Sequence, residues 1–101
     1  MLHKVKIIAE VGINHNGNIS KAKKLIDIAK ETGADYVKFQ SYITENLLNQ
    51  YEPLMKYQKL NINKKINQFE MLKKFELNLF DQIKIKKYCK KKKIHFLSTP
   101  Y

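Results

Sequence analysis

The chain of 101 residues contains no arginine, and all 20 of its basic residues are lysines. With 9 acidic residues the formal net charge is +11, a value that ordinarily suggests a polyanionic partner. Proteins that read nucleic-acid sequence depend on the planar guanidinium group of arginine, which grips guanine and phosphate with two hydrogen bonds. The absence of arginine therefore argues against nucleic-acid recognition, although a basic binding module without catalytic activity stays open as an alternative.

Cysteine and long apolar runs are also scarce. The single cysteine, Cys89, cannot form an internal disulfide, and its lysine-rich surroundings without a neighbouring base favour a structural thiol over a nucleophile. No segment resembles a secretory hydrophobic region or a membrane span. Motifs of the HxxxH or CxxC type are absent, and the glycines lack phosphate-loop spacing. We therefore expect a cytoplasmic protein that binds neither membranes nor nucleic acid, and whose own residues form no complete metal site.

The sequence does contain an alternation of strand and helix patterns. Short, β-branched apolar segments predict strands at residues 4–11, 34–42 and 94–101. Helical spacing predicts helices at residues 21–31, 66–77 and 78–93. The intervening residues 42–68 have no clean period and are predicted to form a long loop with one or two short helical turns. This order predicts an α/β fold whose strands run parallel.

The predicted helices carry recognisable ends. Either Ser20 or Asn18 can cap the first helix, and Asn78 is the expected N-cap of the last one. In that last helix Phe80, Ile83 and Tyr88 are expected to face the core.

Polar residues gather where each predicted strand ends. They are Glu10, Asn14 and His15, then Lys38 and Gln40, then Ser98 and Thr99. Ligands of α/β proteins bind at the carboxyl ends of parallel strands, so we expect these side chains to share one edge of the sheet. A lysine within the apolar run YVKFQ is costly to bury without a counter-charge, which favours an anionic ligand. Two alternatives stay open: Lys38 pairs with Glu10 for structural reasons, and His15 hydrogen-bonds to its own backbone.

Four strings occur in order along almost the whole chain. They are IIAEVGINHNGNISKAKKLIDIAKETGADYVKFQ, the pair Tyr57 and Gln58, FEMLKKFEL and FLSTPY. Together they resemble the N-terminal part of the sialic acid synthase family, which includes N-acetylneuraminate, legionaminic acid, pseudaminic acid and spore-coat polysaccharide synthases. The resemblance implies that residues 1–101 are the N-terminal segment, about the first three strands, of a (β/α)8 TIM barrel. The remaining barrel and a C-terminal antifreeze-like domain are expected to lie beyond it.

The resemblance also implies a reaction. The family condenses phosphoenolpyruvate with an N-acetylated amino sugar such as N-acetylmannosamine and releases phosphate, with Mn²⁺ or Mg²⁺ as Lewis acid in a homodimeric full-length enzyme. By this likeness Glu10 is the catalytic residue that holds the sugar and relays a proton, and Lys38 binds phosphoenolpyruvate. The other matched positions are implied substrate contacts: Asn14, His15, Gln40, Tyr57, Gln58, Ser98 and Thr99.

The chain departs from the family pattern in two respects. The family usually has glycine before the third strand, where this chain has Lys93, so that turn must take a conformation that a side chain tolerates. The metal-binding histidines of the family lie on later strands, and neither His3 nor His95 can replace them. We therefore expect residues 1–101 alone to be inactive. Another phosphoenolpyruvate-condensing or aldolase-type barrel stays open as an alternative.

Overall fold

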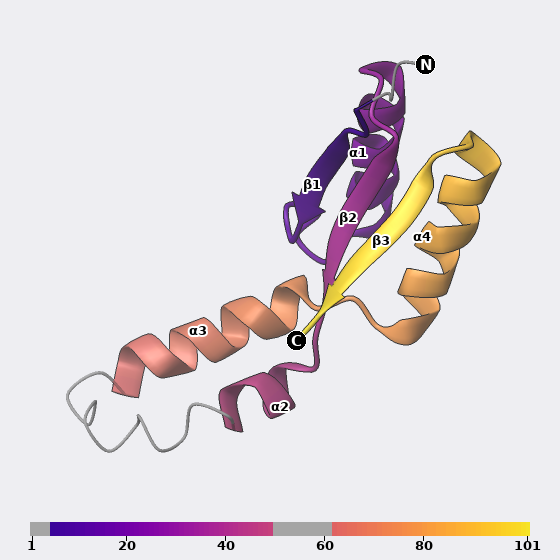
Figure 1. Cartoon of the computed structure of the whole chain (residues 1–101). Helices are drawn as coiled ribbons and strands as arrows, with labels where there is room; N and C mark the ends of the chain where they lie inside the picture. Colours follow the sequence, from indigo (N-terminus) through magenta and orange to yellow (C-terminus); the bar gives the residue numbers. More distant parts are fainter. Residues whose placement is uncertain (1–4, 50–61) are drawn as a thin grey trace.

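The computed structural model describes residues 5–49 and 62–101, which form a three-stranded sheet and four helices (Figure 1). The elements in chain order are β1 (Ile8–Gly12), α1 (Ile19–Glu31), β2 (Tyr36–Ser41), α2 (Thr44–Asn49), α3 (Ile62–Phe75), α4 (Leu79–Lys92) and β3 (His95–Pro100). The strands lie in the order β1-β2-β3, and both neighbouring pairs are parallel. The predicted α/β fold with parallel strands is therefore confirmed.

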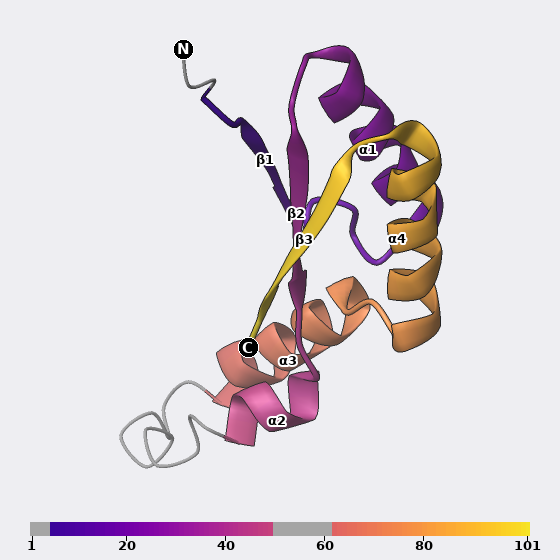
Figure 2. The same ribbon diagram turned by 45° about the vertical axis from the view of Figure 1, so that its right-hand side comes forward.

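The helices are distributed unevenly around the sheet. Figure 2 shows α1 and α4 on one face and α2 and α3 beyond the carboxyl ends of the strands. The core lies between the sheet and the first two of these helices, where Val37, Phe39, Ile26 and Ile85 are buried. Because side chains alternate along a strand, the neighbours of Val37 and Phe39 point to the other face. No helix among the described residues covers that second face.

Asparagines begin both helices that cover the sheet. Asn18, not Ser20, is the N-cap of α1, and its Oδ1 accepts hydrogen bonds from the backbone N–H groups of Ser20 and Lys21 at 2.8 and 3.1 Å. Asn78 caps α4 as predicted, and its Oδ1 accepts from the backbone N–H of Asp81 at 2.8 Å. Each cap satisfies donors that the first turn of a helix leaves free.

The region between β2 and α4 contains more helix than the sequence predicts. Within residues 42–68, where a long loop with one or two short helical turns is expected, α2 is such a short helix, but α3 begins at Ile62 instead of residue 66. Contacts between distant residues stabilise this pair of helices. The Tyr42 hydroxyl donates to the Leu72 carbonyl at 2.7 Å, and Lys73 Nζ lies 2.8 Å from Glu45 Oε1. The apolar periodicity of the sequence does not predict such tertiary contacts.

The face of α4 that meets the core was predicted wrongly. Phe80 and Ile83 are 78% and 44% exposed, whereas Ile85 and Cys89 are buried. Only Tyr88 of the predicted set packs against the core, and it does so partly. Ile85 and Cys89 lie four residues apart and so share one helix face, but lysines around them obscure the apolar period.

Lys93 ends α4 in the left-handed region, with φ 60° and ψ 44°. This is the turn for which the resemblance implies glycine, and the lysine side chain is accommodated at a positive φ. For an L-residue with a Cβ atom, that conformation is strained by about 1–2 kcal/mol. The turn therefore carries a local strain that glycine would remove.

Lys93→Gly is expected to raise the free energy of unfolding by about 1 kcal/mol, because glycine adopts positive φ without a Cβ clash. Chemical denaturation of the variant and the parent protein measures the change. The matched control is Lys91→Gly, within the last turn of α4, which is expected to lower the stability by up to about 1 kcal/mol. A Lys93→Gly variant as unstable as the control would show that the turn is not strained.

Candidate functional site

An ion pair joins β1 and β2 two to three residues before their carboxyl ends. Glu10 and Lys38 are directly opposite in the parallel register, and Lys38 Nζ lies 3.2 Å from Glu10 Oε2. Their strand neighbours Val11, Val37 and Phe39 belong to the core under α1 and α4, so both side chains point to the uncovered face, and they remain 50% and 37% exposed. The two charged groups therefore partly neutralise each other while staying accessible to a third group.

A bulge at the end of β1 brings Gln40 to this pair. The register shifts between Glu10 and Gly12, and Gly12 has a φ of +56°. A Cβ atom at Gly12 would lie 3.5 Å from both Gln40 Nε2 and Glu10 Oε1. The amide of Gln40 and the carboxylate of Glu10 therefore both border the space that a side chain at Gly12 would fill.

Thr99 of β3 completes the group. It is paired with Gln40 in the β2–β3 register, so the two residues occupy neighbouring positions on one face of the sheet. We call Glu10, Lys38, Gln40 and Thr99 the strand-end site. It contains one cation, two neutral hydrogen-bond donors and one carboxylate, a set that suits an anionic ligand beside a group that exchanges a proton.

Ser98 points away from the strand-end site. Its hydroxyl is hydrogen-bonded to Ser41 Oγ on the face of the sheet that the helices cover. Successive side chains of a strand alternate between the two faces, so Ser98 and Thr99 cannot both reach one ligand on the uncovered face. Of this predicted pair, the structure brings only Thr99 to the strand-end site.

His15 is part of the packed loop that follows β1. The ring is fully buried and stacks on Phe39 with 5.9 Å between ring centroids. Its Nδ1 accepts a hydrogen bond from the Gly17 backbone N–H at 2.9 Å, the local arrangement that was one of the two alternatives. Burial lowers the pKa of His15, which favours the neutral ring with its proton on Nε2. The structure therefore does not bring His15 to the strand-end site.

The other residues predicted to contact a substrate are not placed in the strand-end site by the structure. Asn14 lies exposed in the same loop, where its backbone N–H donates to the Val11 carbonyl at 3.0 Å. Tyr57 and Gln58 fall outside the described residues.

No group of three or more His, Cys, Asp or Glu side chains within residues 5–49 and 62–101 could hold a metal ion. The strand-end site itself offers a single carboxylate, which does not make a site for Mn²⁺ or Mg²⁺.

Sequence reasoning missed two residues behind the strand-end site. Ser41 Oγ donates to Gln82 Oε1 at 3.0 Å, linking the end of β2 to the first turns of α4. The two residues are 41 positions apart, and neither belongs to a recognisable spacing. Only the fold reveals that they meet.

Residues 25–101 match the NeuB family. The chain belongs to the NeuB family. It is 42% identical to the N,N'-diacetyllegionaminic acid synthase of Campylobacter jejuni over 99% of its own length and 30% of that enzyme. The corresponding synthase of Legionella pneumophila is also 42% identical, over 94% of the chain and 27% of the enzyme. The chain thus spans less than a third of the length of these relatives.

Solved structures of NeuB-family relatives share the fold. An N-acetylneuraminic acid synthetase from Leptospira borgpetersenii, solved in complex with citrate, superposes with a TM-score of 0.75 at 30% identity and covers 98% of the chain and 30% of that structure. The spore coat polysaccharide biosynthesis protein SpsE of Bacillus subtilis gives a TM-score of 0.64 at 35% identity, over 97% of the chain and 24% of that structure. The three-stranded parallel sheet and its helices are therefore an arrangement found within sialic acid synthase structures.

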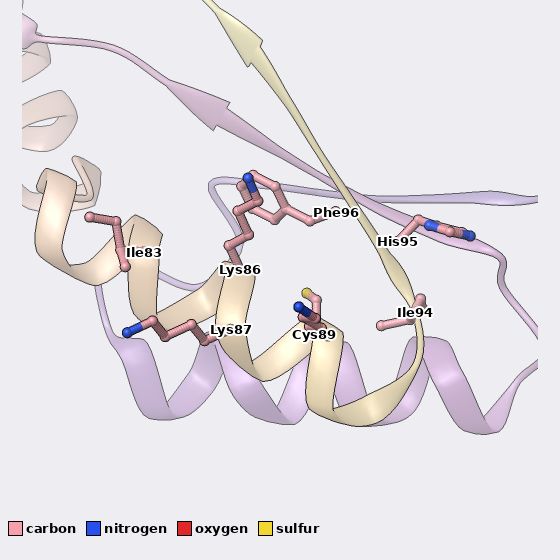
Figure 3. Close-up of a pocket in the computed structure, with 8 residues that line it drawn as sticks. Ile83, Lys86, Lys87, Cys89, Ile94, His95 and Phe96 are labelled. Carbon is pink, nitrogen blue, oxygen red and sulfur yellow. The ribbon is translucent and has the colours of Figure 1, made fainter.

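This NeuB-family chain also has an open groove of about 600 Å³ between α4 and β3. Figure 3 shows its apolar lining residues, Ile83, Cys89, Ile94 and Phe96, together with lysines of α4 and His95. Cys89 is buried, and burial raises the pKa of its thiol to about 11, which disfavours the thiolate near neutral pH and agrees with a structural role. The groove contains no member of the strand-end site. The described helices of this chain are all too short or too polar to cross a membrane.

Proposed function

We propose that this chain contributes the strand-end site to a nonulosonate synthase, which condenses phosphoenolpyruvate with an N-acetylated amino sugar such as N-acetylmannosamine and releases phosphate. The observation that carries the proposal is the Glu10–Lys38 pair, which is accessible near the carboxyl ends of two parallel strands. Membership of the NeuB family and the names of the two legionaminic acid synthases support the product class.

Different residues of the strand-end site bind the two substrates. The Lys38 ammonium binds the carboxylate or the phosphate of phosphoenolpyruvate, and the Gln40 amide and the Thr99 hydroxyl donate further hydrogen bonds to the bound substrates. Glu10 holds the reacting end of the sugar and relays a proton at its carboxylate. Binding of an anion to Lys38 would loosen the ion pair, since the ammonium group would then be shared between Glu10 and the bound anion.

We propose further that β1, β2 and β3 are the first three strands of a (β/α)8 barrel. The support is the one-sided cover of the sheet: α1 and α4 pack on one face, and the opposite face carries the strand-end site. Such an arrangement suits the outer helices and the inner surface of a barrel. On this proposal residues 1–101 alone hold part of an active site and do not catalyse the reaction. The described residues of the strand-end site offer a single carboxylate and do not fit a divalent metal.

The test is a phosphate-release assay on the protein expressed at its natural length, in a buffer that contains MnCl₂. Phosphate is expected only when phosphoenolpyruvate and N-acetylmannosamine, or a related N-acetylated amino sugar, are both present. Mass spectrometry should then detect a nonulosonic acid. Phosphate release from phosphoenolpyruvate alone, or no release with any sugar of this class, would contradict the proposal. Residues 1–101 assayed alone serve as the control and should release none.

A further inference from the structure

A chain of hydrogen bonds joins the carboxyl ends of β2 and β3 to the beginning of α4. The Ser41 hydroxyl donates to Gln82 Oε1 at 3.0 Å, and it is also hydrogen-bonded to the Ser98 hydroxyl. Since the single hydroxyl proton of Ser41 goes to Gln82, Ser98 must be the donor to Ser41. Gln82 Nε2 donates in turn to the Leu77 carbonyl at 2.9 Å. The network therefore ends at Gln82, whose amide oxygen and amide nitrogen both have hydrogen-bond partners.

This network lies back to back with part of the strand-end site. Ser41 directly follows Gln40, and Ser98 directly precedes Thr99. The register of β2 and β3 pairs Gln40 with Thr99. Because consecutive side chains of a strand point to opposite faces, the two serines lie on one face of the sheet and Gln40 and Thr99 lie on the other. Any movement of Ser41 or Ser98 therefore turns the backbone that aims Gln40 and Thr99.

The backbone of Gln82 is itself well anchored. Its N–H donates to the Asn78 carbonyl at 3.0 Å, and Asn78 is the N-cap of α4. The side chain therefore extends from the fixed first turns of a helix that packs on the core through Ile85 and Cys89. A rigid support of this kind transmits the position of the helix to the two strand ends.

We propose that Gln82 is a positioning residue of the strand-end site, which fixes Gln40 and Thr99 through Ser41 and Ser98 without touching a substrate. The kinetic consequence of this inference rests on the proposed function, but its geometric content does not. Gln82 and Ser41 should therefore affect substrate binding even though they lie on the helix-covered face.

The kinetic test compares two substitutions in the natural-length protein. Gln82→Met keeps the length of the side chain but removes both hydrogen bonds, and it is expected to raise KM for at least one substrate about fivefold to tenfold, roughly the effect of one lost hydrogen bond. The value of kcat should stay within about twofold. Gln82→Glu keeps an acceptor for Ser41 but loses the donor to the Leu77 carbonyl, so it should recover only part of the lost affinity. Lys84→Met, at an exposed position of the same helix, is the control and should leave both constants unchanged.

A substrate-free measurement separates this inference from the proposed function. Backbone amide NMR signals of Gln40 and Thr99 should shift in Gln82→Met and stay in place in Lys84→Met. If the parent protein releases no phosphate, the proposed function fails while these shifts still decide the geometric claim. Unmoved signals of Gln40 and Thr99 would overturn the inference. In an active protein, an unchanged KM in Gln82→Met or a Gln82→Glu variant as impaired as Gln82→Met would overturn it as well.

Discussion

Lys38→Ala is expected to lower kcat/KM for phosphoenolpyruvate by about 10²- to 10³-fold, the usual effect of removing one group that stabilises developing or bound negative charge. Lys38 is the cation of the strand-end site, and its ammonium is accessible on the uncovered face beside Gln40 and Thr99. The neutral donors that remain cannot neutralise a carboxylate or a phosphate. Steady-state kinetics of phosphate release, with phosphoenolpyruvate varied, measures the loss.

Stability measurements distinguish this role from the structural alternative for the same pair. Because Glu10 and Lys38 are 50% and 37% exposed, their attraction contributes at most about 1 kcal/mol to the free energy of unfolding. Lys38→Ala should therefore unfold almost as the parent protein does while its activity collapses. Lys24→Ala, at an exposed position of α1, is the matched control for the loss of one positive charge. Near-wild-type kinetics in a folded Lys38→Ala protein would refute the proposed role.

Glu10→Gln separates the two members of the pair. The substitution removes the carboxylate that relays a proton and releases Lys38 from its partner, so kcat should fall while KM for phosphoenolpyruvate does not rise. A structural ion pair without catalytic function predicts instead that Glu10→Gln and Lys38→Ala have small and similar effects. The two kinetic profiles therefore show whether the Glu10 carboxylate and the Lys38 ammonium group act on different substrates.

The sequence predicted the strand-end site as far as the positions of polar residues along the predicted strands allow. Glu10 and Lys38 are charged residues within two otherwise apolar strands, and parallel pairing of these strands brings them together. Ser98 shows the limit of that reasoning, since its side depends on the pleat and a shift of one residue exchanges the faces. Gln82 could not be found at all, because it meets Ser41 through packing of α4 and not through any pattern in the chain.

His15 illustrates a different limit of sequence reasoning. A histidine in a polar loop after a strand resembles a ligand contact, yet this ring is buried on Phe39 and bonded to the Gly17 N–H. The loop folds back because Asn16 and Gly17 both adopt positive φ, at 55° and 72°. Residue types permit such a turn but do not specify it, since asparagine and glycine occur in many turn types. The burial of His15 is therefore a consequence of tertiary packing.

Gly17→Ala is expected to destabilise the protein by several kcal/mol. A Cβ atom there would lie 2.1 Å from the Lys74 carbonyl oxygen, far inside contact distance, and the φ of +72° is unfavourable for any residue with a side chain. The conformation contributes about 1–2 kcal/mol and the overpacking about 1–3 kcal/mol. Lys74 belongs to the last turn of α3, and backbone cannot move aside as a flexible side chain can. Thermal and chemical denaturation measure the loss.

Gly33→Ala is the matched control, because Gly33 also has a positive φ, +89°, but a Cβ atom there would meet nothing within 4 Å. Its substitution should cost only the conformational part, about 1–2 kcal/mol. The difference between the two variants therefore isolates the contact between α3 and the loop that follows β1. Because that loop directly follows β1, which contains Glu10, and contains the N–H that holds His15, a forced separation from α3 should disturb the strand-end site as well as the fold. Equal losses at Gly17 and Gly33 would contradict the close approach of the loop and α3.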